Sequence, residues 1–194
     1  VTEFAVDLSD PETTYTLAEY QSDDFYANPG SLVLEGGHMP AGDGFGRDRG
    51  DGAGGQIVQM SADKQSVFLY GNTYNEDPMV EGPKSFLDRI EIRTGESTRV
   101  FESANDEEYE TIVSILDVDA GAFVVNYESP TRIEQSYLVT GGQRLQLTQN
   151  VDYTPDLTNA PRQRFTVERP DGFRFVVNVT LPPDYTAGER LPAM

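Results

Sequence analysis

The sequence contains no cysteine and no tryptophan, and it has a single histidine. Without cysteine the chain can form no disulfide, bind no metal through thiolates and use no cysteine nucleophile. The one histidine, His38, lies in a glycine-rich stretch away from any candidate Ser-Asp pair, and we interpret it as a loop residue. The nucleophile-elbow motif G-x-S-x-G is also absent, so these residues alone cannot form a Ser-His-Asp triad.

Basic residues and long apolar runs are scarce as well. There are 14 basic residues against 33 acidic ones, which gives a formal net charge of -19. Such a surface repels phosphate backbones and anionic lipids, so we expect neither nucleic acid nor a membrane as a partner. We interpret the acidity as a solvated surface; attraction of cationic substrates or metal ions is the alternative. No apolar run approaches the roughly 18 residues of a membrane span, and the first ten residues lack the basic and apolar regions of a signal peptide.

What the sequence does contain is turn residues between short apolar runs. Its 18 glycines and 12 prolines separate β-branched and aromatic stretches, and helix-period patterns are almost absent. This composition predicts an all-β fold.

One hairpin pattern occurs three times. Phe4 to Leu17 holds two short apolar strands around a turn, and Ile90 to Phe101 repeats it at one constant offset. Tyr137 to Leu147 repeats it again with a turn one residue shorter. Two further apolar strands precede each of the later copies, at 56–60 and 67–70 and at 111–116 and 122–127. Repeated units of four antiparallel strands are typical of the blades of a β-propeller.

We therefore predict a partial β-propeller of about two and a half four-stranded antiparallel blades. The outer half of one blade covers about residues 1–20, and two complete blades follow at about 30–103 and 108–149. Blades that do not close a ring leave sheet edges to be paired elsewhere. We expect this polypeptide to work alongside additional chain.

The last stretch, Arg162 to Met194, has its own pattern. Apolar residues alternate on both sides of a Pro170-Asp171-Gly172 turn, and Pro182-Pro183 ends the second run, which predicts a β-hairpin with one buried face. We predict a propeller part at 1–150, a linker at 151–161 and a truncated second domain at 162–194. Because a new apolar run begins at Leu191, we expect the C-terminus to be a cut; the N-terminus resembles the middle of a strand.

Several segments together resemble one branch of the prolyl oligopeptidase family of serine peptidases, the glutamyl endopeptidase-like enzymes of bacteria and plastids. The hairpin ending in L-P-P-x-Y before L-P-A resembles the family's passage from propeller to α/β-hydrolase domain. Further matches follow the branch patterns D-Y-Y-x-x-P-G-S, F-L-D-R, T-G, R-x-W-x-S, Y-x-E-x-V-V and E-S-P-T. They lie at 24–31, 86–89, 94–95, 99–103, 109–113 and 128–131, with Phe101 in place of the usual Trp. The chain departs from the branch at 36–55 and in a shortened loop at 151–161.

The resemblance implies a serine peptidase whose propeller caps a hydrolase domain. The hairpin would be the first two strands of that hydrolase, and its Ser, His and Asp would lie beyond Met194. The propeller would restrict entry to peptide substrates, and the chain alone would be inactive. The implied partners are the remaining blades and the hydrolase domain of the same polypeptide, with no cofactor and no metal. We expect an extracytoplasmic location, in the bacterial periplasm or secreted.

The long Gly/Asp/Arg stretch from Gly36 to Gly55 holds the candidate substrate-binding residues, Arg47 and Arg49. Either guanidinium could pair with an acidic substrate side chain through two hydrogen bonds; a solvated loop is the alternative. The same stretch matches G-x-G-x-x-G at Gly50, but no strand precedes it and no helix follows, so we attribute the match to chance. Its carboxylates could bind calcium, yet the alternating ligand spacing fails at Phe45 and Arg47.

Two other functional classes fit parts of the sequence. The first is an acidic, non-enzymatic β-sheet binding module, which predicts a closed monomer or a symmetric oligomer. The second is a glycosidase with paired carboxylates, for which runs such as Asp106-Glu107-Glu108 provide candidates. We interpret that run as a solvated connection between blades.

Overall fold

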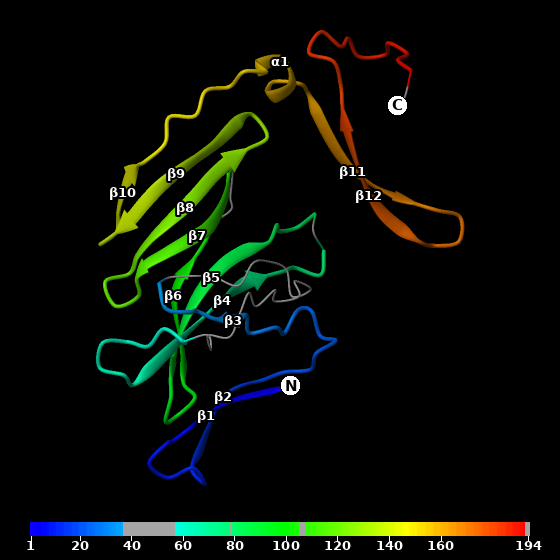
Figure 1. The fold of residues 1–194 in the computed structure, drawn as a ribbon. Helices are drawn as coiled ribbons and strands as arrows, with labels where there is room; N and C mark the ends of the chain where they lie inside the picture. The colour runs from blue at the N-terminus through cyan, green and yellow to red at the C-terminus, as the bar shows by residue number, and fades with distance from the viewer. Residues whose placement is uncertain (37–56, 78, 105–107, 193–194) are drawn as a thin grey trace, which may run out of the picture. The chain divides into compact units, whose positions relative to one another are not determined.

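The computed structural model describes residues 1–36, 57–77, 79–104 and 108–192 (Figure 1). The regular secondary structure of the described residues is nearly all β-strand, as predicted, and their only helix is a single turn. No helix in this part of the chain is long and apolar enough to cross a membrane. The chain divides into two compact units, one of Val1–Glu128 with Glu134–Gln149 and one of Ser129–Ile133 with Asn150–Met194.

The first unit contains three antiparallel sheets. The first sheet is the two-stranded hairpin of β1 (Thr2–Val6) and β2 (Thr14–Glu19). The second sheet has the order β3-β4-β5-β6, with bounds Ser31–Leu32, Ser66–Thr73, Lys84–Glu91 and Ser97–Glu102. The third sheet has the order β10-β9-β8-β7, with β7 Tyr109–Asp117, β8 Ala122–Ser129, β9 Arg132–Thr140 and β10 Gln143–Gln146.

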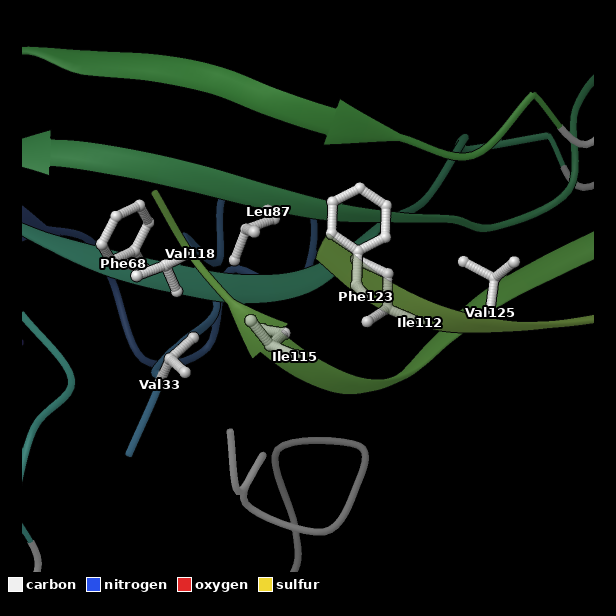
Figure 2. Close-up of a cluster of buried hydrophobic side chains, with 8 residues drawn as sticks. All are labelled: Val33, Phe68, Leu87, Ile112, Ile115, Val118, Phe123 and Val125. Atoms are coloured by element: carbon white, nitrogen blue, oxygen red, sulfur yellow. The ribbon is translucent and has the colours of Figure 1, made fainter. Parts of the chain in front are cut away.

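Strand β4 of the second sheet is buried on both faces in its first half, which explains its unbroken apolar run Val67-Phe68-Leu69-Tyr70. Alternate residues of a strand point to opposite faces, so Phe68 joins the core shared with the third sheet, while Val67 and Leu69 join the core shared with the first. Figure 2 shows the larger of these two cores. Its buried side chains are Val33, Phe68, Leu87, Ile112, Ile115, Val118, Phe123 and Val125. Each fully buried side chain of this kind contributes roughly 1.5–3 kcal/mol relative to its exposed state.

A repeated irregularity supports the internal repeat seen in the sequence. The pairing of β1 with β2 shifts register between Glu3 and Phe4, and the pairing of β5 with β6 shifts between Leu87 and Asp88. Leu87 and Asp88 follow Glu3 and Phe4 in the sequence by the same number of residues by which Ile90 follows Val6. In the hairpin of β9 and β10, two successive N–H groups donate to one carbonyl, that of Ser136, over 2.8 and 3.4 Å. Two residues opposite one is the pattern of a β-bulge, which bends and twists a strand locally.

Some strand bounds differ from the predicted ones. Strand β5 begins at Lys84 rather than Ile90, and it includes Asp88, which pairs with Arg99, and Arg89, which donates a hydrogen bond to the Ser66 hydroxyl. The strand predicted at 56–60 is, where described, reduced to isolated bridges at Val58 and Met60. This segment pairs with the chain next to β3 through two 2.8 Å hydrogen bonds, from the Gln59 N–H to the Val33 carbonyl and from the Glu35 N–H to the Ile57 carbonyl.

The second unit contains the predicted C-terminal hairpin, β11 (Arg162–Glu168) with β12 (Arg174–Thr180). Its turn needs Gly172, which has φ +84°. The predicted linker 151–161 includes the helix α1 (Pro155–Thr158), a single turn that starts with proline and that helix periodicity could not reveal. The division into domains at 150 and 161 stays a prediction.

The hairpin's apolar face is not buried, contrary to our prediction. Phe165 pairs with Val177 and Val167 pairs with Phe175, so the apolar side chains of both strands do share one face. Phe173 is nevertheless 60% exposed, Phe165 42% and Phe175 39%. Within the second unit, the described residues place nothing over this face.

Candidate binding site

The predicted substrate-binding residues, Arg47 and Arg49, lie outside the described residues, as does His38. The possible calcium ligands Asp43, Asp48 and Asp51 lie there too. These interpretations therefore stay predictions, and the candidate site comes from the remainder of the first unit.

A cavity of about 710 Å³ lies beside β1, against the second sheet. One wall is formed by Phe4 to Leu8 of the first hairpin, and the floor includes Leu32, Val58 and Met60. The floor residues flank the buried Val67 of β4. The size falls within the range of ligand-binding clefts, and the apolar walls suit a partner that brings apolar groups.

Charged side chains stand at the rim of this cavity, fixed by local hydrogen bonds. Asp63 accepts a 2.6 Å hydrogen bond from the Ser61 hydroxyl and a 3.1 Å bond from the Gln65 N–H. These bonds stabilise the carboxylate and hold the pKa of Asp63 below its usual value. Asp7 accepts bonds from the hydroxyl and N–H of Ser9, which lower its pKa in the same way.

The rim also carries two cations. Arg93 lies 5.8 Å from the centroid of the Tyr15 ring, and its Nη1 is 3.4 Å from the Tyr15 hydroxyl. Lys64 holds a left-handed backbone, φ 58°, in the turn that forms one side of the cavity. The charged residues that line the cavity are thus two acidic ones, Asp7 and Asp63, and two basic ones, Lys64 and Arg93, so neither sign dominates.

The cavity is equipped for binding and not for covalent chemistry. Among the described residues that line it there is no serine, cysteine or histidine, so no nucleophile stands beside a base. No group of three or more His, Asp or Glu side chains in the described parts of the chain is placed to hold a metal ion. An apolar floor with a mixed-charge rim can accommodate a neutral, mainly apolar segment.

A smaller cavity of about 440 Å³ lies between turns of the second and third sheets. The Ala62 N–H donates a 2.7 Å hydrogen bond to the Asp119 carboxylate across this boundary. The bond joins residues far apart in the sequence, so it ties the two sheets together at their turns. We interpret this cavity as a seam between sheets.

The residues of the F-L-D-R motif have structural roles. Arg99 Nε lies 2.5 Å from Asp88 Oδ1, and its guanidinium sits 4.3 Å from the centroid of the Phe86 ring. Arg89 Nε donates a 2.9 Å hydrogen bond to the Ser66 hydroxyl, and Leu87 belongs to the core. The contacts of this motif therefore hold β5 between its neighbouring strands β4 and β6. They give no evidence for a catalytic role.

A second charged contact joins opposite edges of the third sheet. Arg144 Nη2 of β10 lies 2.5 Å from Oε1 of Glu110, a residue of β7 that is only 1% exposed. The guanidinium also lies 5.4 Å from the centroid of the Tyr127 ring of β8. A buried carboxylate needs such compensation, and here it comes from a half-exposed arginine.

Sequence reasoning missed the cavity beside β1. Its walls come from segments near residues 4–8, 15–17, 58–67 and 92–93, which no local motif connects. The repeat was the one signal in the sequence that could have indicated this cavity. Two strands precede each of the later hairpins, and the first hairpin lacks them.

No family model matches the chain, and no solved structure matches it. Among curated proteins, the chain is 24% identical over 187 residues to a probable glutamyl endopeptidase, chloroplastic, of Oryza sativa subsp. japonica, an alignment covering 91% of this chain and 18% of that protein. It is likewise 24% identical over 179 residues to the protein of the same description from Arabidopsis thaliana, covering 87% of this chain and 17% of that protein. The chain thus spans less than a fifth of the length of these relatives. Over most of its length it is a distant relative of plant proteins described as probable glutamyl endopeptidases.

Proposed function

We propose that this chain is the non-catalytic propeller portion of a serine peptidase, followed by the first hairpin of its α/β-hydrolase domain. The observation that carries the proposal is the extent of the similarity to the plant proteins. One alignment runs through both the repeated sheets and the C-terminal hairpin, covering 91% of the chain. The repeated bulges and the two shared cores support the reading of the sheets as successive blades.

In the complete enzyme the chemistry belongs to residues beyond Met194. A serine hydroxyl attacks the peptide carbonyl and transfers its proton to a histidine, which an aspartate orients. The amine leaves with that proton; the histidine then takes a proton from water, which attacks the acyl carbonyl, and returns it to the serine oxygen as the acid is released. Nothing in the described residues substitutes for these groups, and the chain's own contribution is to restrict which peptides reach them.

Arg47 and Arg49 are our proposed contacts to an acidic substrate side chain. A guanidinium can form two parallel hydrogen bonds with a carboxylate, a geometry that favours a Glu-containing peptide over its Gln counterpart. Loss of such a contact weakens binding of the acidic substrate and leaves the reaction of a neutral one intact.

The test uses the complete polypeptide and peptide substrates that differ only in Glu or Gln. We expect the complete polypeptide to hydrolyse peptides and residues 1–194 alone to be inactive. The variants Arg47→Ala and Arg49→Ala should raise KM for the Glu peptide and leave the Gln peptide unaffected. Hydrolysis by residues 1–194 alone would contradict the proposal, and unchanged kinetics in both variants would remove the arginine contact.

The cavity beside β1 favours a second candidate function, the acidic non-enzymatic binding module. A binding module of this kind would be a closed monomer or a symmetric oligomer in which apolar faces are covered. The described residues instead leave large apolar side chains exposed in both units, including Leu8, Leu145 and Phe173. Exposed apolar area of this kind favours a part of a larger protein.

A further inference from the structure

We propose that the cavity beside β1 is the seat of one more β-strand, supplied by the same polypeptide, which pairs antiparallel with the open edge of β1. The inference rests on the proposed function in one respect, because it needs further residues of the same polypeptide to supply the strand. The location, direction and side-chain chemistry of the strand follow from the structure of the first unit.

The first observation is the open edge. Strand β1 pairs with β2 along one side, and no strand among the described residues pairs with its other side. An open edge presents unpaired N–H and C=O groups, which readily accept an added strand. A two-stranded sheet is also marginally stable by itself.

The second observation is the cavity next to that edge. The first sheet packs on the second through Ala5, Ala18 and Leu17, but Leu32, Val58 and Met60 of the same core also line the cavity. These three side chains are only partly buried. A strand placed against β1 would lie over them and continue the first sheet across the second.

The third observation is the repeat. The hairpin of β1 and β2 corresponds to that of β5 and β6, with Val6 in the place of Ile90. The other edge of β5 is occupied by β4, in a register that puts Val67 opposite Ile90. The third hairpin is completed in the same manner, with β8 beside β9. By this correspondence the missing partner of β1 is a strand equivalent to β4.

The repeat also defines the side chains that the added strand should carry. In β4, Phe68 is buried against the third sheet and Tyr70 packs against the same core. The equivalent positions of the added strand would face Leu32, Val58 and Met60. We therefore expect large apolar or aromatic residues at these alternate positions.

One polar group of β1 also lacks a partner. Glu3 Oε2 is buried and makes no hydrogen bond within the described residues, although the carboxylate does bond to Tyr20. Leaving a buried acceptor unpaired is costly, and an added strand would bring donors to β1. A second copy of this chain is a poor source of that strand, because two bodies of net charge -19 repel each other.

The test uses residues 1–194 and a synthetic peptide with the sequence Ser66 to Thr73, the repeat equivalent of the missing strand. Hydrogen exchange of the β1 amides should slow about tenfold at saturating peptide, because pairing protects amides that are otherwise open. The amides of β5, whose partner β4 is already in place, are the internal control and should not change. A matched peptide carrying Phe68→Asp and Tyr70→Asp should leave β1 unprotected.

Three results would overturn the inference. These are exchange at β1 that does not respond to the peptide, equal protection by the two peptides, and protection that appears without peptide as the chain concentration rises. The last result would make a second copy the occupant. None of the three bears on the peptidase proposal, which is tested independently by the reactivity of the complete polypeptide.

Discussion

At the scale of single residues, the Pro29-Gly30-Ser31 segment illustrates how one glycine sets the approach of two backbones. Gly30 has φ +91°, and a Cβ placed there would lie 2.3 Å from the Tyr70 carbonyl oxygen. No side chain fits without moving backbone. The close approach of the two backbones therefore explains why glycine occupies this position of the P-G-S motif, independent of any catalytic role.

We predict that Gly30→Ala destabilises the first unit by about 2 kcal/mol or more, since backbone strain and a backbone clash add. The matched control is Gly121→Ala. Gly121 also has a positive φ, +60°, but a Cβ there would meet nothing within 4 Å. The control should lose only the strain, about 1 kcal/mol. Chemical denaturation of both variants measures the difference, and equal losses would contradict the close approach at Gly30.

Glu3 provides a pH-dependent prediction. Burial raises the pKa of Glu3, and the hydrogen bond from Tyr20 offsets this only in part. The charged form is thus disfavoured in the folded state, so the destabilisation is present at neutral pH and disappears as pH falls below the pKa of the unfolded chain. We expect Glu3→Gln to raise Tm at pH 7 and to leave it nearly unchanged at pH 4. A larger gain at pH 4 than at pH 7 would refute this assignment.

At the scale of elements, the C-terminal hairpin has a well-defined register but an exposed apolar face. The rings of Phe173 and Phe175 stack with centroids 6.3 Å apart on that face. Exposed aromatic area of this kind binds hydrophobic dyes and promotes association. The surface should therefore be detectable in the isolated chain.

We predict that the double variant Phe173→Ser with Phe175→Ser lowers binding of a hydrophobic dye and leaves the unfolding of the first unit unchanged. Arg174→Ser is the control, because its side chain points to the opposite face of β12. Dye fluorescence and thermal unfolding, recorded on the three proteins, give the answer. A loss of stability in the first unit would mean that this face has a structural role there.

The elements also show how far the sequence alone leads. Alternation and turn residues predicted the hairpins because one period identifies a strand with one apolar face. The start of β5 was missed because Asp88 and Arg89 look like loop residues until Arg99 and Ser66 are known to lie beside them. The exposure of the hairpin was missed because periodicity identifies an apolar face but not what covers it.

At the scale of the whole molecule, the second sheet of the first unit packs one face on the first sheet and the other face on the third sheet. Ile90 and Ile92 of the second sheet pack toward the first, and the equivalent Tyr137 and Val139 of the third pack toward the second. The equivalent residues of the first sheet, Val6 and Leu8, are exposed. At the other end of the series Leu145 and Leu147 are exposed in turn.

The open face of the first sheet contributes Val6 and Leu8 to the cavity beside β1. The strands could be predicted from the sequence because one copy of a repeat predicts the strands of the next. The cavity could not be predicted, because its walls come from four segments that are distant in the sequence. The candidate residues Arg47 and Arg49 stay a prediction from the sequence. The open sheet faces are what we expect if our proposal is right that the chain is a portion of a larger polypeptide.

The most direct test of the central claim is to label the complete polypeptide with a fluorophosphonate, which reacts with activated serines, and to locate the adduct by mass spectrometry. The account predicts one adduct, on the serine of a G-x-S-x-G motif beyond Met194, and no adduct on residues 1–194 treated alone. An adduct on a serine within residues 1–194, or no adduct anywhere in the complete polypeptide, would contradict the account.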